Sequence, residues 1–153
     1  MNYSDFIYNE VKTKITPLDI NVLEWIDNKT DLAQKIPTCI INNISTFEVG
    51  DISNIDQNFF YELTDQIDII FGYNIQGSKE SENKARIKYN ELKAELIKAL
   101  TPLKTITNID NDNNQKCFIA NAKFKSSEAR NEINHKQVYY IFTFYINYNL
   151  TQL

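Results

Sequence analysis

Few side chains in this 153-residue chain combine a reactive type with a spacing that suits catalysis. The one histidine, His135, lies in a charged and polar segment with no nucleophile motif beside it, which is typical of a solvated loop residue. The sequence contains no phosphate-binding glycine loop, no C-x-x-C and no H-E-x-x-H. The 3 glycines stand apart, at Gly50, Gly72 and Gly77, which leaves little to build a phosphate cradle. We therefore predict no catalytic residues and no enzyme activity.

A calcium site is the nearest approach to a metal motif. Residues 110–114 place oxygen-bearing side chains where the first, third and fifth ligands of a calcium loop would stand. The sixth position, which needs glycine, is Gln115, and the twelfth, which needs glutamate, is Asn121. We expect an ordinary Asn-rich turn here, with no bound metal or other cofactor.

The 2 cysteines, Cys39 and Cys117, both lie in apolar runs. They are expected to be small buried hydrophobic residues rather than a disulfide. A hydrophobic content of 42% and a charged content of 24% are typical of a globular chain, and the length suits a single domain, residues 1–153.

The net charge of −4 argues against sequence-specific binding to duplex DNA, because such binding relies on a basic surface. No apolar stretch reaches the 18 or so residues that a membrane helix needs, so we expect no membrane association. The chain opens without the basic and apolar regions of a secretory signal, and we expect a protein made and used in the cytosol.

Two segments have the apolar spacing of amphipathic helices, and each ends at a proline. Residues 2–14 carry apolar side chains at intervals of three and four before Pro17, and residues 78–101 do the same before Pro102. Ser81 is the expected N-terminal cap of the second helix.

Residues 61–75 carry the clearest strand pattern, with apolar side chains at most odd positions and polar side chains at most even ones. An extended segment of this length spans about 50 Å, well beyond an average strand. Further strands are expected at residues 36–43, 118–124 and 138–148, the last two forming a hairpin around a solvated loop, residues 125–137. Residues 19–27 favour a strand over a short helix, and 45–58 and 104–116 are expected to be turn-rich or polar connections.

This order of elements predicts an α+β fold, a mostly antiparallel sheet with the two main helices packed on one face. Within residues 61–75, Asp65 and Asp68 lie on opposite faces of the strand, so they do not form a catalytic pair. Asp65 interrupts the apolar face. We expect that stretch of the strand to be exposed, and the alternative is that Asp65 meets another subunit.

The last expected strand carries large side chains on both faces. Tyr139, Ile141 and Tyr145 lie on one face, and the other face is lined by Tyr140, Phe142, Phe144 and Ile146. Two amphipathic helices cover one face of a sheet, so we expect the second face to contact another copy. The alternative is that loops from residues 19–58 cover it. The candidate interface residues are Tyr139, Ile141, Tyr145, Asp65 and Asp68.

The arrangement resembles the tail terminator (tail completion) proteins of long-tailed bacteriophages. The resemblance rests on the N-terminal helix, the proline-led strand at residues 36–41, the long strand followed by a linking helix, and the closing aromatic strand at residues 138–145. It covers nearly the whole chain and is one of architecture, without a specific motif.

This resemblance implies a structural protein of the virion tail or neck, assembled in the host cytoplasm. It implies a homo-oligomeric ring, a homohexamer, that caps the tail tube and joins it to the head–tail connector protein. Its partners would be its own copies, the tail tube protein and the connector, with DNA passing through the lumen without sequence-specific binding. Other readings are a small acidic binding module of the immunity or inhibitor type, or a small enzyme with an unrecognised site.

Overall fold

A computed structural model describes residues 3–24, 37–48, 61–74, 78–110, 115–131 and 137–151. Two α-helices, one 3-10 turn and six strands follow one another in these ranges. In chain order they are α1 (Tyr3–Ile15), η1 (Thr16–Leu18), β1 (Asn21–Leu23), β2 (Thr38–Glu48), β3 (Tyr61–Asn74), α2 (Lys79–Leu100), β4 (Thr105–Asp110), β5 (Gln115–Asn131) and β6 (Gln137–Leu150).

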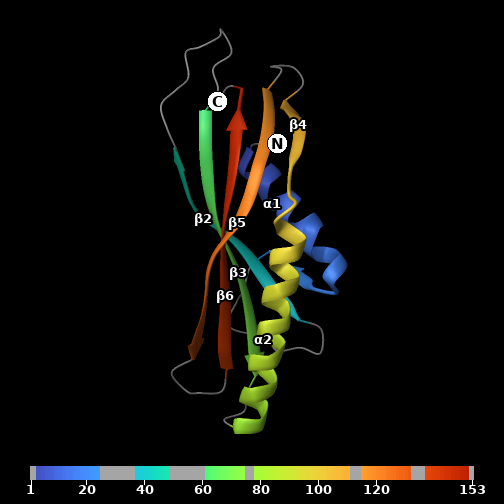
Figure 1. Ribbon diagram of the computed structural model, residues 1–153, viewed down its shortest axis with the longest axis vertical. Helices are drawn as coiled ribbons and strands as arrows, with labels where there is room; N and C mark the ends of the chain where they lie inside the picture. Colours follow the sequence, from blue (N-terminus) through green and yellow to red (C-terminus); the bar gives the residue numbers. More distant parts are fainter. Residues whose placement is uncertain are drawn as a thin grey trace.

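The strands form a single twisted sheet in the order β1-β2-β3-β6-β5-β4 (Figure 1). The short β1 runs parallel to β2, and every other neighbouring pair is antiparallel. Strands β3 and β6 are paired along their whole length, from Tyr61 opposite Leu150 to Asn74 opposite Gln137. The mostly antiparallel α+β prediction is confirmed.

Both helices pack on the same face of this sheet. The core joins Ile7, Val11 and Ile15 of α1 to Leu92 and Leu96 of α2. It also contains odd-numbered residues of β3 and even-numbered residues of β6, among them Ile67, Ile69, Phe71, Phe142, Phe144 and Ile146. The period-two and period-3.6 patterns therefore meet in one buried layer, as the sequence predicted.

The N-terminus of α2 differs from the sequence prediction. Ser78, rather than Ser81, is the N-cap: its backbone is extended, and its hydroxyl oxygen accepts a hydrogen bond from the Ser81 backbone N–H at 3.1 Å. Ser81 lies inside the first turn, where its N–H needs an acceptor that the cap supplies.

Two strands, β2 and β5, are longer than predicted, and one strand, β4, was not predicted at all. β2 continues to Glu48 through a segment expected to be turn-rich, and β4 occupies part of the expected polar connection. β5 continues through residues 125–131, which were expected to be loop. In each case a neighbouring strand supplies backbone partners, so polar residues remain extended where apolar periodicity gives no signal.

Other predictions fall partly on described residues. The three-residue β1 confirms a strand within residues 19–27, and residues 25–27 lie outside the described ranges. His135 and residues 111–114 also lie outside them. Both cysteines are buried and free, as predicted. Among the described residues, no helix is long and apolar enough to cross a membrane.

Candidate interaction surface

The face of the sheet opposite the helices carries the predicted interface residues of β6. Tyr139 and Tyr145 are half-buried there, and Ile141 is 9% exposed. Ile141 stands opposite Ile70 of β3, which stands opposite Ile40 of β2, so three isoleucines form one row across the sheet. Ile141 therefore offers little surface to a neighbour, whereas the two tyrosines keep part of theirs.

Tyr145 is held between residues of two other strands. Its ring meets that of Phe47 edge to face, with 5.8 Å between the ring centroids. The Lys125 ammonium lies 4.6 Å from the centroid of the Tyr145 ring, within range of a cation–π interaction. These contacts orient a partly exposed aromatic cluster that runs from β2 to β5.

Asp65 is not exposed, which corrects the sequence expectation. Its side chain is fully buried on the core face, and its carboxylate accepts three hydrogen bonds of 2.7 Å, from Asn43 Nδ2, Thr46 Oγ1 and the Tyr148 hydroxyl. A buried carboxylate needs such donors. Asp65 therefore links β2, β3 and β6 inside one subunit and has no surface to offer a second copy.

Asp68 lies on the opposite face from Asp65, as predicted. It is half-buried and accepts a hydrogen bond from Thr143 Oγ1 at 2.8 Å. A second polar row crosses the same face, where Thr64 Oγ1 donates to Asn147 Oδ1 at 2.5 Å and Asn147 Nδ2 donates to Asn121 Oδ1 at 2.6 Å. Side-chain hydrogen bonds thus tie β3, β6 and β5 together on this face.

The hydrogen bonds to Asp65 also hold a β-bulge in β2 in place. Its two β2 donors, Asn43 and Thr46, stand on either side of the register shift between Asn43 and Ser45. The residue within that bulge, Ile44, is 51% exposed, and Phe47 is 41% exposed. Two of the three exposed large hydrophobic side chains in the described part of the chain therefore lie on this short stretch of β2.

Both sides of the sheet have an open edge within the described ranges. β4 pairs with β5 only as far as Ile119, so residues 120–131 have a described neighbour, β6, on one side alone. β1 pairs with β2 only as far as Ile40, so β3 is the only described neighbour of residues 41–48. Sequence patterns could not reveal these edges, because they depend on the order of the strands.

The two open edges lie at the same height in the sheet. Phe47 stands opposite Thr64, then Asn147, then Asn121, along one continuous row. A similar row of paired positions runs from Asn42 through Asp68 and Thr143 to Ser126. A second copy placed beside one edge at this height would bring its own other edge alongside, and within the described ranges neither edge has a strand on its outer side.

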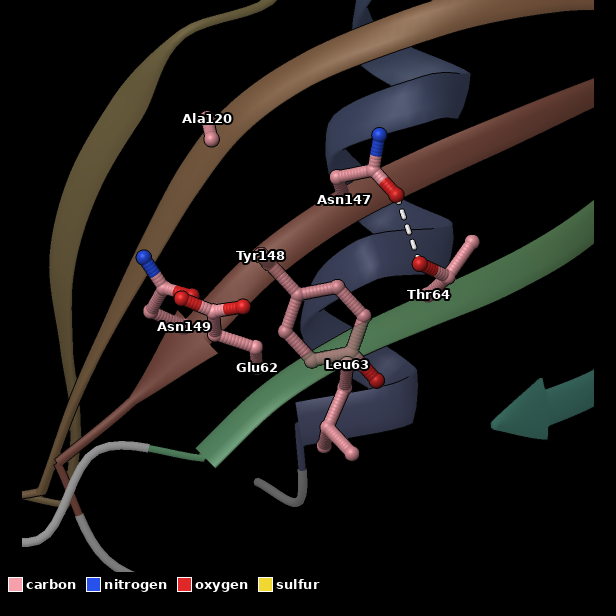
Figure 2. A pocket seen from close by; sticks show the side chains of 7 residues that line it. All are labelled: Glu62, Leu63, Thr64, Ala120, Asn147, Tyr148 and Asn149. Carbon is pink, nitrogen blue, oxygen red and sulfur yellow. Dashed lines mark hydrogen bonds between the residues drawn. The ribbon is translucent and has the colours of Figure 1, made fainter. Parts of the chain in front are cut away.

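A pocket of about 260 Å³ opens beside the first of these rows (Figure 2). Its lining brings together β3, β5 and β6 and consists of Glu62, Leu63, Thr64, Ala120, Asn147, Tyr148 and Asn149. The Thr64–Asn147 hydrogen bond spans one side of it. The lining combines one carboxylate with two amides and two hydroxyls, which suits polar contacts rather than nucleophilic chemistry.

Within the described ranges, the two cysteine thiols and the side chains that commonly bind metals do not form a reactive centre. Burial raises the pKa of both the Cys39 and the Cys117 thiol to about 12, so neither is a thiolate at neutral pH. No group of three or more His, Cys, Asp or Glu residues in the described part of the chain could hold a metal ion.

Comparison with known proteins gives no family for this chain. No family model matches it, and no curated protein is significantly similar to it.

Proposed function

We propose that this protein is a structural virion assembly protein, a tail terminator that forms a homohexameric ring. The ring would cap the tail tube and join it to the head–tail connector protein. The observation that carries this proposal is the pair of open edges, residues 41–48 and 120–131, at opposite sides of one sheet and at one height.

A closed ring needs two different complementary surfaces on each subunit, so that the same contact repeats until the rotation closes. Two unlike edges at opposite sides of a sheet are surfaces of that kind. The architecture adds support, because helices on one face leave the other face and its partly exposed tyrosines for contacts outside the subunit. Figure 1 shows the long strands extending well past α1.

The charge of the chain is compatible with a channel for DNA. Each copy carries a net charge of −4, and a ring would multiply it. A negative lumen would let DNA slide, because few cations would hold its phosphates. Glu62 is exposed and Asp68 half-buried on the face away from the helices, where they are candidates for the lumen lining.

Tube assembly tests this function. A tail tube protein would be polymerised alone and with the purified protein, and tube lengths would be measured by electron microscopy. We expect the protein to bind one tube end and to stop growth. Tubes of unchanged length with bare ends would contradict the proposal, and a monomer that binds one unrelated protein would favour the immunity or inhibitor type instead.

A further inference from the structure

We propose that β5 of one copy pairs with β2 of the next copy, so that the sheet continues from subunit to subunit. The contact would join residues 120–127 of one copy to residues 41–47 of another, the parts of the two open edges that share rows across the sheet. This inference rests on the proposed function for its ring, and it specifies which edges meet, in which direction and in which register.

The strand directions allow this contact in a head-to-tail ring. β2, β3, β6 and β5 are successive antiparallel neighbours, so β5 runs opposite to β2. A second copy that is related by rotation about an axis along the strands would keep these directions. Its β2 would therefore lie antiparallel to β5 of the first copy, in the favourable geometry for regular pairing.

The rows across the sheet give the register. If the copies stand at equal height, residues that share a row within one subunit become neighbours between subunits. The matched pairs, from β5 to β2, are Asn121 with Phe47, Lys123 with Ser45, and Ser126 with Asn42. All six lie on the face away from the helices, whereas a slip by one residue would set this face against the core face.

Charge favours unlike edges over like ones. Residues 120–131 contain Lys123, Lys125, Arg130 and Glu128, a net charge of +2 in a chain whose net charge is −4. Residues 41–48 contain Glu48 and no cation, a net charge of −1. Two β5 edges would bring like charges together in a two-fold dimer, whereas residues 41–47 of β2, which would face Lys123 and Lys125, carry no charge of either sign.

The exposed apolar side chains of β2 also favour β5 of another copy as the partner. Ile44 and Phe47 are 51% and 41% exposed at the open edge. The lysines of the arriving β5 edge have long aliphatic stems that can cover apolar side chains while the ammonium groups stay in water. The pairing therefore removes exposed hydrophobic surface without burying a charge.

Disulfide trapping in the full-length protein tests the register. Ser45→Cys and Lys123→Cys would be combined, since both residues are exposed and antiparallel partners stand at distances that a disulfide spans. The matched control combines Ser45→Cys with Glu128→Cys, which is on the same face but about 13 Å further along β5. The native thiols would not compete, because both are buried.

We expect the first double variant to form a ladder of covalent oligomers under mild oxidation, and the control pair and each single variant to remain uncrosslinked. Disulfide dimers of a single variant would instead reveal a two-fold contact and would overturn the proposal. Light scattering on the same samples separates the two claims. A ring mass without cross-links refutes only this edge pairing, whereas a monomer mass refutes ring assembly as well.

Discussion

The hydrogen bonds to Asp65 predict an uneven response to substitution. Asp65→Ala removes an acceptor that three side chains share. The bond from Tyr148 is buried, and a bond to a charged group contributes about 1.5–3 kcal/mol. Asn43 and Thr46 are exposed and can form hydrogen bonds with water instead. The loss of each of their bonds to Asp65 therefore adds only about 0.5 kcal/mol. We expect Asp65→Ala to lower the free energy of unfolding by about 3 kcal/mol.

Asp65→Asn is the matched control, because it keeps the shape. The remaining oxygen can still accept from Thr46 and Tyr148, which both bond to Oδ1, and the new amide can donate to Asn43 once that exposed amide turns. We expect a loss of about 1 kcal/mol or less, close to that of one neutral hydrogen bond.

Urea unfolding at pH 7, followed by circular dichroism at one fixed protein concentration, measures both variants. A double-mutant cycle between Asp65→Ala and Tyr148→Phe should show a coupling of about 1.5 kcal/mol or more, since both changes remove the same bond. The reasoning fails if Asp65→Ala lies within about 0.5 kcal/mol of the wild type, or if the alanine and asparagine variants are equally stable.

Three further predictions concern stability. Tyr73→Phe should leave the protein as stable or up to about 1 kcal/mol more stable in urea, because the buried Tyr73 hydroxyl has no hydrogen-bond partner within the described ranges; a loss of more than about 1 kcal/mol would contradict this. Ser78→Ala should cost about 1 kcal/mol in thermal or urea unfolding through loss of the cap, and Ser81→Ala should cost less; the reverse order would place the cap at Ser81. Stability should fall as pH rises above about 9, because burial raises the pKa of the Cys39 and Cys117 thiols from 9.0 to about 12, and the unfolded chain loses those protons first. Urea midpoints at pH 8, 9 and 10 measure this fall, and Cys39→Ala should flatten it; a midpoint independent of pH would show that these thiols ionise equally in both states.

Periodicity predicted the elements that have one buried and one polar face. In α1, β3 and α2 the apolar side chains recur at the period of a helix or of a strand. Their type and their buried side could therefore be predicted from the sequence. The last seven residues of β5 carry polar or small side chains on both faces, because this part of the strand lies at an edge, and they were mistaken for a loop. Backbone pairing with β6 holds them extended, and no local pattern records a partner of that kind.

The candidate surface was predictable only in part. The two-sided apolar character of β6 pointed to Tyr139 and Tyr145, which are half-buried on the face opposite the helices, and their role in an interface stays a prediction. Asp65 was misplaced because its donors are 19, 22 and 83 residues away in sequence. The open edges depend on which strands become neighbours in space, which is a property of the whole topology.

The central claim is that the subunit works by joining copies of itself, and the mass of the native protein tests it most directly. Light scattering across a range of protein concentrations should give about 107 kDa, six times the chain mass of 17.9 kDa. A mass of 17.9 kDa at every concentration, in the presence as in the absence of the tail tube protein, would contradict the account.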